Sequence, residues 1–172
     1  GQAMFKVPDN VTDTMIVSAN CALAQVIMGL ERVNVEMGDR VVIQGCGGLG
    51  VYACAVAKER GAEKVIAIDG ISERLALAKQ MGADEVINYS TTSLKDAVKE
   101  LTGGKGVDVV YDPVGGDYAE PAIRSMAWNG RYLVIGFASG PIPKIPLNLT
   151  LLKGCSIVGV FWGRFTGEEP KV

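Results

Sequence analysis

The sequence contains no histidine among its 172 residues. Histidine is therefore excluded as a general base, as a metal ligand and as the central member of a Ser-His-Asp triad. The four cysteines, Cys21, Cys46, Cys54 and Cys155, are scattered without the C-x-x-C spacing of structural zinc sites. The same scatter argues against a disulfide framework and favours a reducing, cytoplasmic compartment.

Basic clusters and long hydrophobic runs are missing as well. The net charge is -2, and no cluster of lysines and arginines is present that could neutralise the phosphates of a nucleic acid. The unbroken apolar runs are far shorter than a membrane-spanning helix requires. We therefore expect neither a nucleic acid nor a membrane as a partner. A hydrophobic fraction of 48% instead favours a globular domain with a sizeable core.

Short apolar runs alternate with helical patterns from residue 41 onward. The runs typical of strands are residues 41–43, 65–68, 85–88, 107–111, 132–136 and 157–161. Most of them lack polar alternation, as strands covered on both faces do. Helices are predicted at residues 19–33, 49–60, 73–81 and 94–101, and a proline-rich loop at residues 141–146. Repeated β-α-β units predict a parallel sheet with right-handed crossovers and helices on both faces.

The stretch 41-VVIQGCGGLG-50 places a G-x-G-x-x-G pattern between the first strand and the helix after it. Gly45 is suited to a tight turn, Gly47 to the close approach of a pyrophosphate, and Gly50 to close contact between helix and sheet. The start of the helix offers free amides and a positive dipole end to the phosphates. In this context the pattern indicates a dinucleotide cradle and not an ordinary glycine-rich turn.

An acidic residue, Asp69, ends the second predicted strand. It can accept hydrogen bonds from both hydroxyls of the adenosine ribose; the alternative is a plain turn or capping aspartate. A 2′-phosphate beside this carboxylate would bring like charges together, so Asp69 favours NAD over NADP. Arg74, one turn into the next helix, could balance a 2′-phosphate, contact the ribose of NAD or be solvated, and NADP therefore stays possible.

Together these residues resemble the nucleotide-binding domain of the medium-chain dehydrogenase/reductase superfamily, which includes zinc-type alcohol dehydrogenases and quinone oxidoreductases. Residues 38–88 look most like the zinc-type enzymes, and residues 106–140 with 151–163 look more like the zinc-independent quinone oxidoreductases. The resemblance implies a Rossmann-type, doubly wound α/β fold with a six-stranded parallel sheet in the order 3-2-1-4-5-6.

The resemblance also implies how the chain is organised. Residues 1–172 are expected to form a single dinucleotide-binding domain, with a leading segment and helix at 1–37 and the Rossmann core at 38–172. The barrel-like catalytic domain of the family is missing from this sequence. We therefore expect a fragment, an excised domain or a stand-alone relic.

The resemblance further implies a set of cofactor contacts. These are Gly47, Gly48 and Leu49 at the pyrophosphate, Asp69 and Arg74 at the adenosine ribose, Pro113 and Val114 at the adenine or ribose, and Gly136 and Phe137 at the nicotinamide end. Val114 and Phe137 could equally be core packing. Tyr89 matches a residue that meets the adenosine phosphate in some NADPH-using quinone reductases.

Metal binding and assembly can be weighed from two further features. Cys21 occupies the position of the third catalytic zinc ligand of zinc-type dehydrogenases, but zinc needs about three protein ligands and the chain offers no partner for it. No metal is therefore expected.

The strand at residues 157–161 pairs with its twin in dimers of the family, and its apolar edge lacks proline, so we expect a homodimer through this strand.

The sequence therefore predicts the NAD(P)-binding domain of an oxidoreductase that carries hydride to or from a nicotinamide cofactor. No catalytic residue is assigned, and the chain alone is expected to transfer hydride poorly or not at all. The alternatives are a non-catalytic dinucleotide-sensing module and a methyltransferase, which also combines a glycine-rich first loop with an acid after the second strand.

Overall fold

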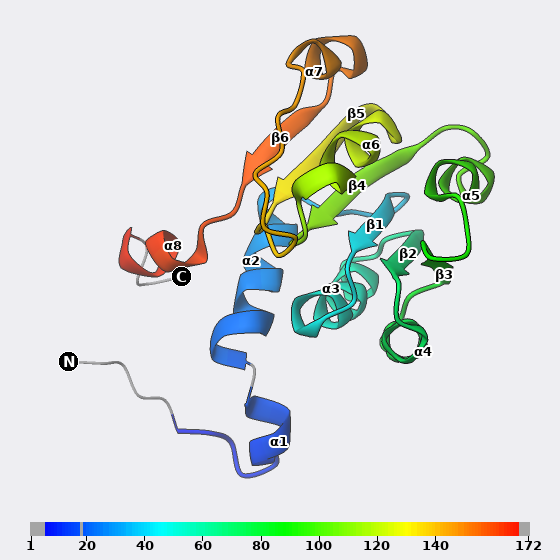
Figure 1. The fold of residues 1–172 in the computed structure, drawn as a ribbon. Coiled ribbons are helices and arrows are strands. Elements are labelled where there is room, and N and C mark those ends of the chain that lie inside the picture. Colours follow the sequence, from blue (N-terminus) through cyan, green and yellow to red (C-terminus); the bar gives the residue numbers. More distant parts are fainter. Residues whose placement is uncertain (1–5, 18, 169–172) are drawn as a thin grey trace.

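The computed structural model describes residues 6–17 and 19–168 and contains one all-parallel sheet within them. Its strands are β1 (Arg40–Gln44), β2 (Lys64–Asp69), β3 (Glu85–Asn88), β4 (Val107–Asp112), β5 (Met126–Val134) and β6 (Ser156–Gly159). They lie in the order β3-β2-β1-β4-β5-β6 (Figure 1). The predicted fold class and strand order are confirmed.

Helices connect the strands and cover the sheet. They are α1 (Asp13–Ile16), α2 (Ala24–Arg32), α3 (Gly48–Glu59), α4 (Ser72–Gln80), α5 (Leu94–Leu101), α6 (Ala119–Arg124), α7 (Asn148–Lys153) and α8 (Trp162–Glu168), with a π-helix at Ala19–Leu23 and a 3-10 helix at Gly116–Tyr118. The short α1 lies apart from the sheet, beyond the start of α2 (Figure 1). No helix among the described residues has both the length and the apolar character that a membrane crossing needs.

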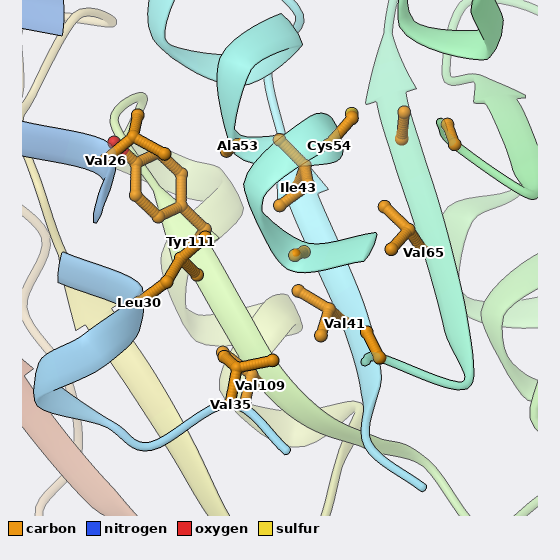
Figure 2. Packing of buried hydrophobic residues seen from close by; sticks show 14 of the residues in the cluster. Val26, Leu30, Val35, Val41, Ile43, Ala53, Cys54, Val65, Val109 and Tyr111 are labelled. Carbon is orange, nitrogen blue, oxygen red and sulfur yellow. The ribbon is translucent and has the colours of Figure 1, made fainter. Parts of the chain in front are cut away.

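The two faces of the sheet carry separate cores because alternate side chains of a strand point to opposite sides. Val41 and Ile43 of β1 belong to the core beneath α2, α3 and α4, whereas Val42 belongs to the core beneath α5 and α6. On the first face, Val26 and Leu30 of α2 pack against the ring of Tyr111 on β4 (Figure 2). Because alternate side chains of each strand enter different cores, helices are needed on both faces of the sheet to cover them.

Small residues let α3 lie close to the sheet. Ala53 and Ala57 are fully buried. Cys54, next to Ala53, is part of the same core (Figure 2). The helix thereby begins at the carboxyl end of β1, directly after the glycine loop. This placement positions the N-terminus of α3 for the site described below.

Several predicted boundaries were wrong by a few residues. The last strand ends at Gly159, because Trp162 already begins α8, and the fifth strand starts at Met126 instead of residue 132. The helix predicted at residues 73–81 is α4, Ser72–Gln80, one residue earlier at each end. The predicted leading helix is present, but its first five residues form the π-helix. The loop at residues 141–146 is confirmed.

Candidate cofactor-binding site

The turn at Gly45 requires glycine for two reasons. Its φ of +88° lies in the left-handed region, where a side chain would be strained. A Cβ added there would also come within 2.7 Å of Cγ2 of Val114. The Gly45 N–H donates to the carbonyl oxygen of Ile68 over 2.8 Å, which fastens the turn to the end of β2.

Gly50 allows the first turn of α3 to rest on this loop. An added Cβ would lie 1.9 Å from the carbonyl oxygen of Gly45 and 3.4 Å from Cγ2 of Ile43. The predicted close contact is present, but its nearest partner is the loop carbonyl rather than a strand side chain. The helix cannot hold this position if the residue carries a side chain.

Gly47 and Gly48 leave the space in front of the glycine loop, at the N-terminus of α3, open. Gly47 is the N-cap of α3 and Gly48 is its first residue, and an added Cβ at either position would meet no atom within 4 Å. Within the described part of the chain, the N–H groups of Gly47, Gly48 and Leu49 find no acceptor. Three unpaired donors at the positive end of a 12-residue helix form a ready anion site.

Asp69 stands beside this space and is only 5% exposed. Its Oδ2 accepts the Cys46 N–H over 2.8 Å, and its Oδ1 accepts the Ile71 N–H over 2.9 Å. The turn-aspartate role considered from the sequence is therefore real. An ionised carboxylate has about four acceptor positions, so two of them stay available for ribose hydroxyls. Arg74 Nη1 lies 3.8 Å from Oδ2, and its side chain is half exposed.

A cavity of about 540 Å³ joins these features, which is within the usual range for small-molecule sites. Nine of the eleven predicted cofactor residues line it: Gly45, Gly47, Gly48, Leu49, Gly50, Asp69, Arg74, Pro113 and Val114. The structure thus brings together residues from the ends of three strands at the point where the strand order reverses, the usual ligand position in open α/β sheets.

Comparison with known proteins shows which family the chain belongs to. The sequence model described as zinc-binding dehydrogenase matches residues 48–172, well over half of the chain. The chain belongs to this family of zinc-binding dehydrogenases. It corresponds to the NAD(P)-binding part of medium-chain dehydrogenase/reductase enzymes, whose members bind nicotinamide cofactors.

Individual relatives agree with this assignment. The rat quinone oxidoreductase-like protein 2 is 39% identical over 98% of this chain and 49% of its own length. The 5-exo-hydroxycamphor dehydrogenase of Pseudomonas putida is 35% identical over 99% of this chain and 48% of its own length. The quinone oxidoreductase of Thermus thermophilus, also solved in complex with NADPH, has a TM-score of 0.82 at 26% identity and covers 96% of this chain and 52% of its own. The chain spans about half the length of these relatives.

The two remaining predicted cofactor residues of this dehydrogenase domain lie outside the cavity. An added Cβ at Gly115 would lie 2.8 Å from Cδ1 of Phe137, so the phenyl ring covers the loop after β4, and Phe137 lines a separate hollow beside Phe161. Gly136 follows β5, and its N–H lies 3.4 Å from the carbonyl oxygen of Asp112. Their assignment to the nicotinamide end stays a prediction.

The sequence did not identify several residues that line the cofactor cavity. Tyr118, in the 3-10 helix after β4, lines the cavity with its ring centroid 5.6 Å from that of Tyr89. Ala138 and Ser139 also line it. No periodic pattern marks these positions, because they lie in a single 3-10 turn and a loop. Tyr89 itself was singled out only through the family resemblance.

A buried acid shapes the loop after β4. Asp112 is 1% exposed, and its Oδ1 accepts the N–H groups of Val114 over 2.7 Å and Gly115 over 2.9 Å. Its Oδ2 accepts the hydroxyl of Tyr132. Asp112 thus holds residues 113–115 against the cavity in the same way that Asp69 holds the glycine loop.

Cys46 lies inside the glycine loop but is a core thiol. Its side chain is 2% exposed and its Sγ lies 3.6 Å from the carbonyl oxygen of Ile68. Burial, together with the nearby Cys54 and Asp69, raises the pKa of this thiol to about 12. A thiol that stays protonated is a poor nucleophile and metal ligand.

The described residues of this chain do not fit a zinc ion, despite the family's name. Cys21 is exposed and sits in the π-helix Ala19–Leu23. Across residues 6–17 and 19–168, no group of three histidine, cysteine, aspartate or glutamate side chains is arranged to hold a metal. Since zinc takes four ligands, of which at least three come from protein, one thiol does not make a site.

Proposed function

We propose that this chain is the NAD-binding half of an oxidoreductase that transfers hydride to or from a nicotinamide cofactor. One observation carries the proposal: three unpaired N–H groups at the start of α3 and the Asp69 carboxylate face the same cavity. Unpaired amides suit a pyrophosphate, and a buried carboxylate suits the hydroxyls of the neighbouring ribose.

Each predicted residue then has a physical role toward the cofactor. Gly47, Gly48 and Leu49 donate their N–H groups to pyrophosphate oxygens. Asp69 accepts from the ribose hydroxyls, with Arg74 beside it. Pro113 and Val114 lie along the adenine or ribose, and Gly136 and Phe137 lie toward the nicotinamide end. The bound dinucleotide supplies the carbon that gives or takes hydride, and this chain binds and orients it.

NAD is the proposed cofactor because the Asp69 carboxylate would repel the 2′-phosphate of NADP. A 2′-phosphate about 4 Å from a carboxylate costs about 1 kcal/mol per charge pair in water and about 4 kcal/mol near a protein surface. Arg74 lies 3.8 Å from Asp69 and offsets part of this cost, less than a buried arginine would because its side chain is half exposed. The expected preference for NAD is therefore about tenfold to a thousandfold.

The experiment that tests this proposal is a fluorescence titration of the chain with NADH and with NADPH side by side. NADH is expected to bind more tightly by at least about tenfold. A relative from Thermus thermophilus was solved with NADPH, so the opposite preference is a concrete alternative. Tighter binding of NADPH would overturn the assignment of Asp69, and no binding of either would overturn the function.

Substrate binding and catalysis are proposed to come from residues beyond these 172. The relatives are about twice as long as this chain. We expect the chain to bind the cofactor without sustained turnover. An NADH-oxidation assay with quinones, aldehydes and enones tests this point, and steady turnover with any of them would contradict it.

A homodimer through β6 and a cytoplasmic location complete the proposal. Among the described residues β6 pairs with β5 alone, which leaves its other edge available for pairing. Ile157 and the nearby Phe161 are 38% and 73% exposed, which supports burial against a second copy. The four cysteines are free thiols in the structure, as a reducing compartment favours.

A further inference from the structure

A second cavity, of about 640 Å³, lies on the sheet face that carries α5 and α6. Its floor is apolar and includes Val42 of β1, Ile68 of β2 and Val98 of α5. It adjoins the cofactor cavity, because Gln44, Ile68, Leu94 and Tyr118 line both. We call this second cavity the trough; nothing in the proposed function uses it.

The trough runs diagonally over the sheet: its lining passes from Ile68 of β2 to Met126 of β5, three strands away, and also extends along the strands. At one end it is lined by Gln44 and Ile68, at the carboxyl ends of β1 and β2, and at the other by Gly106 and Met126, at the starts of β4 and β5. The register Val41 to Val109 places Gly106 level with residue 38, six residues below Gln44. At about 3.3 Å per residue the trough extends about 20 Å along the strand direction, which is long enough for a linear ligand.

Positive charge lines the trough without any acid. Its lining residues include the five cations Lys95, Lys99, Lys105, Arg124 and Lys153, and no aspartate or glutamate, although the whole chain carries a net charge of -2. Arg124 is bound to Glu120, and Lys153 Nζ donates to the Met126 carbonyl oxygen over 2.7 Å. The ammonium groups of Lys95, Lys99 and Lys105 form no hydrogen bond or ion pair with the described residues. Lys95 and Lys99 also repel each other at i, i+4 on α5, and a bound anion would relieve that repulsion.

Gln44 provides a polar group at the opposite end. Its side chain is 5% exposed and lines the trough, and its amide nitrogen Nε2 has no acceptor within the described part of the chain. A buried donor without an acceptor is unfavourable unless something supplies one. The terminal torsion of glutamine is broad and two-fold, so the amide can turn its nitrogen toward the trough.

We propose that the trough binds a linear aliphatic carboxylate of the fatty-acid class. The carboxylate lies between Lys99 and Lys105, and the chain lies along Val42, Ile68 and Val98. The far end reaches Gln44, whose amide donates to an oxygen there when the ligand carries one. This inference stands apart from the proposed function, because Lys99 and Lys105 line the trough and not the cofactor cavity.

The test uses Trp128, which lines the trough and is 69% exposed. Trp162→Phe makes it the single tryptophan of the chain, which has two. Adding dodecanoate is expected to change Trp128 fluorescence until it saturates. Dodecyltrimethylammonium, with the same chain and the opposite charge, is expected not to saturate at the same concentrations. Equal binding of the two probes would overturn the proposal.

Charge variants then locate the carboxylate. Lys99→Gln with Lys105→Gln is expected to weaken dodecanoate binding roughly three- to tenfold. The control, Lys79→Gln with Lys144→Gln, makes the same change of charge at two exposed lysines outside the trough, and distant exposed charges are screened, so affinity should stay within about twofold. If the two double variants behave alike, the proposed site is wrong.

Gln44→Leu tests the other end. ω-Hydroxydodecanoate is expected to bind the parent chain more tightly than dodecanoate does, and Gln44→Leu is expected to abolish that difference while leaving dodecanoate binding in place. A preference that persists in Gln44→Leu would show that the amide does not contact the ligand. Circular dichroism of each variant confirms that the fold is retained.

Discussion

The carboxylate of Asp69 accepts a hydrogen bond from the N–H of Cys46 over 2.8 Å, across 23 positions of sequence. Cys46 lies inside the glycine loop, so the acid assigned to the ribose also fixes the loop assigned to the pyrophosphate. The ribose part and the pyrophosphate part of the proposed site are therefore joined by this hydrogen bond. A change at Asp69 or in the loop around Cys46 is expected to alter the geometry of both parts.

Asp69→Asn is expected to destabilise the domain as well as weaken cofactor binding. An asparagine offers one oxygen in place of two, so one of the two N–H groups bound by Asp69 loses its acceptor and faces an NH₂ group instead. The free energy of unfolding should fall by about 1–3 kcal/mol, measured by urea denaturation. Asp117→Asn, at an exposed position, is the matched control. Equal stability of the two variants would contradict this role of Asp69.

Gly50→Ala and Gly47→Ala are expected to separate packing from binding. At Gly50 the new methyl group meets the Gly45 carbonyl oxygen at 1.9 Å, so the loop must shift; the expected loss of stability is about 1–3 kcal/mol. At Gly47 the methyl group meets nothing within 4 Å, yet it projects where the pyrophosphate is proposed to lie. Gly47→Ala should keep its melting temperature and bind NADH roughly tenfold more weakly or worse. Unchanged NADH affinity in Gly47→Ala would argue against the cradle.

The sequence was sufficient for the glycine loop and Asp69 because their spacing is local, and repeated β-α-β units predicted the parallel sheet. The order of its strands came from the family resemblance. It was insufficient where contacts are long-range. Asp112 reads as an ordinary strand-end acid, and the sequence does not reveal its hydrogen bond from the hydroxyl of Tyr132, 20 residues further along the chain. Likewise α6, α7 and α8 have six or seven residues each, too short for a periodic pattern to reveal.

Only one of the four thiols is expected to react readily in the folded protein. Burial raises the pKa of both Cys46 and Cys54 to about 12, and Cys155 is buried, whereas Cys21 is exposed. At pH 8 a thiol-specific disulfide reagent should therefore modify Cys21 fast and the other three slowly. Cys21→Ser should remove the fast phase. Rapid reaction of Cys46 would show that the glycine loop opens to solvent.

Acid should destabilise the domain in part through Asp84. Burial acts to raise the pKa of this carboxyl, but hydrogen bonds from the Val65 N–H and from Lys58 outweigh it, so the pKa lies below the ordinary value of 3.8. A depressed folded-state pKa means that the stabilisation is present above about pH 4 and is lost as the pH falls below it. Because the side chain is 36% exposed, the contribution should stay under about 1 kcal/mol. Asp84→Asn should lose less stability than the parent between pH 6 and pH 3 in urea titrations, and an identical loss would exclude this role.

Ile157→Pro should prevent dimerisation without disturbing the sheet. The Val160 N–H donates to the Val134 carbonyl oxygen, so by alternation the Val158 N–H also points toward β5, whereas the Ile157 N–H points to the free edge of β6. Proline at 157 removes a donor that only a second copy could use, and edge strands tolerate proline there.

Val158→Pro, one residue further along, instead removes a bond to β5 and should lower the free energy of unfolding by about 1–3 kcal/mol. Sedimentation at micromolar concentration is expected to give a dimer for the parent and a monomer of unchanged stability for Ile157→Pro. A dimer that survives Ile157→Pro would place the interface elsewhere on the molecule.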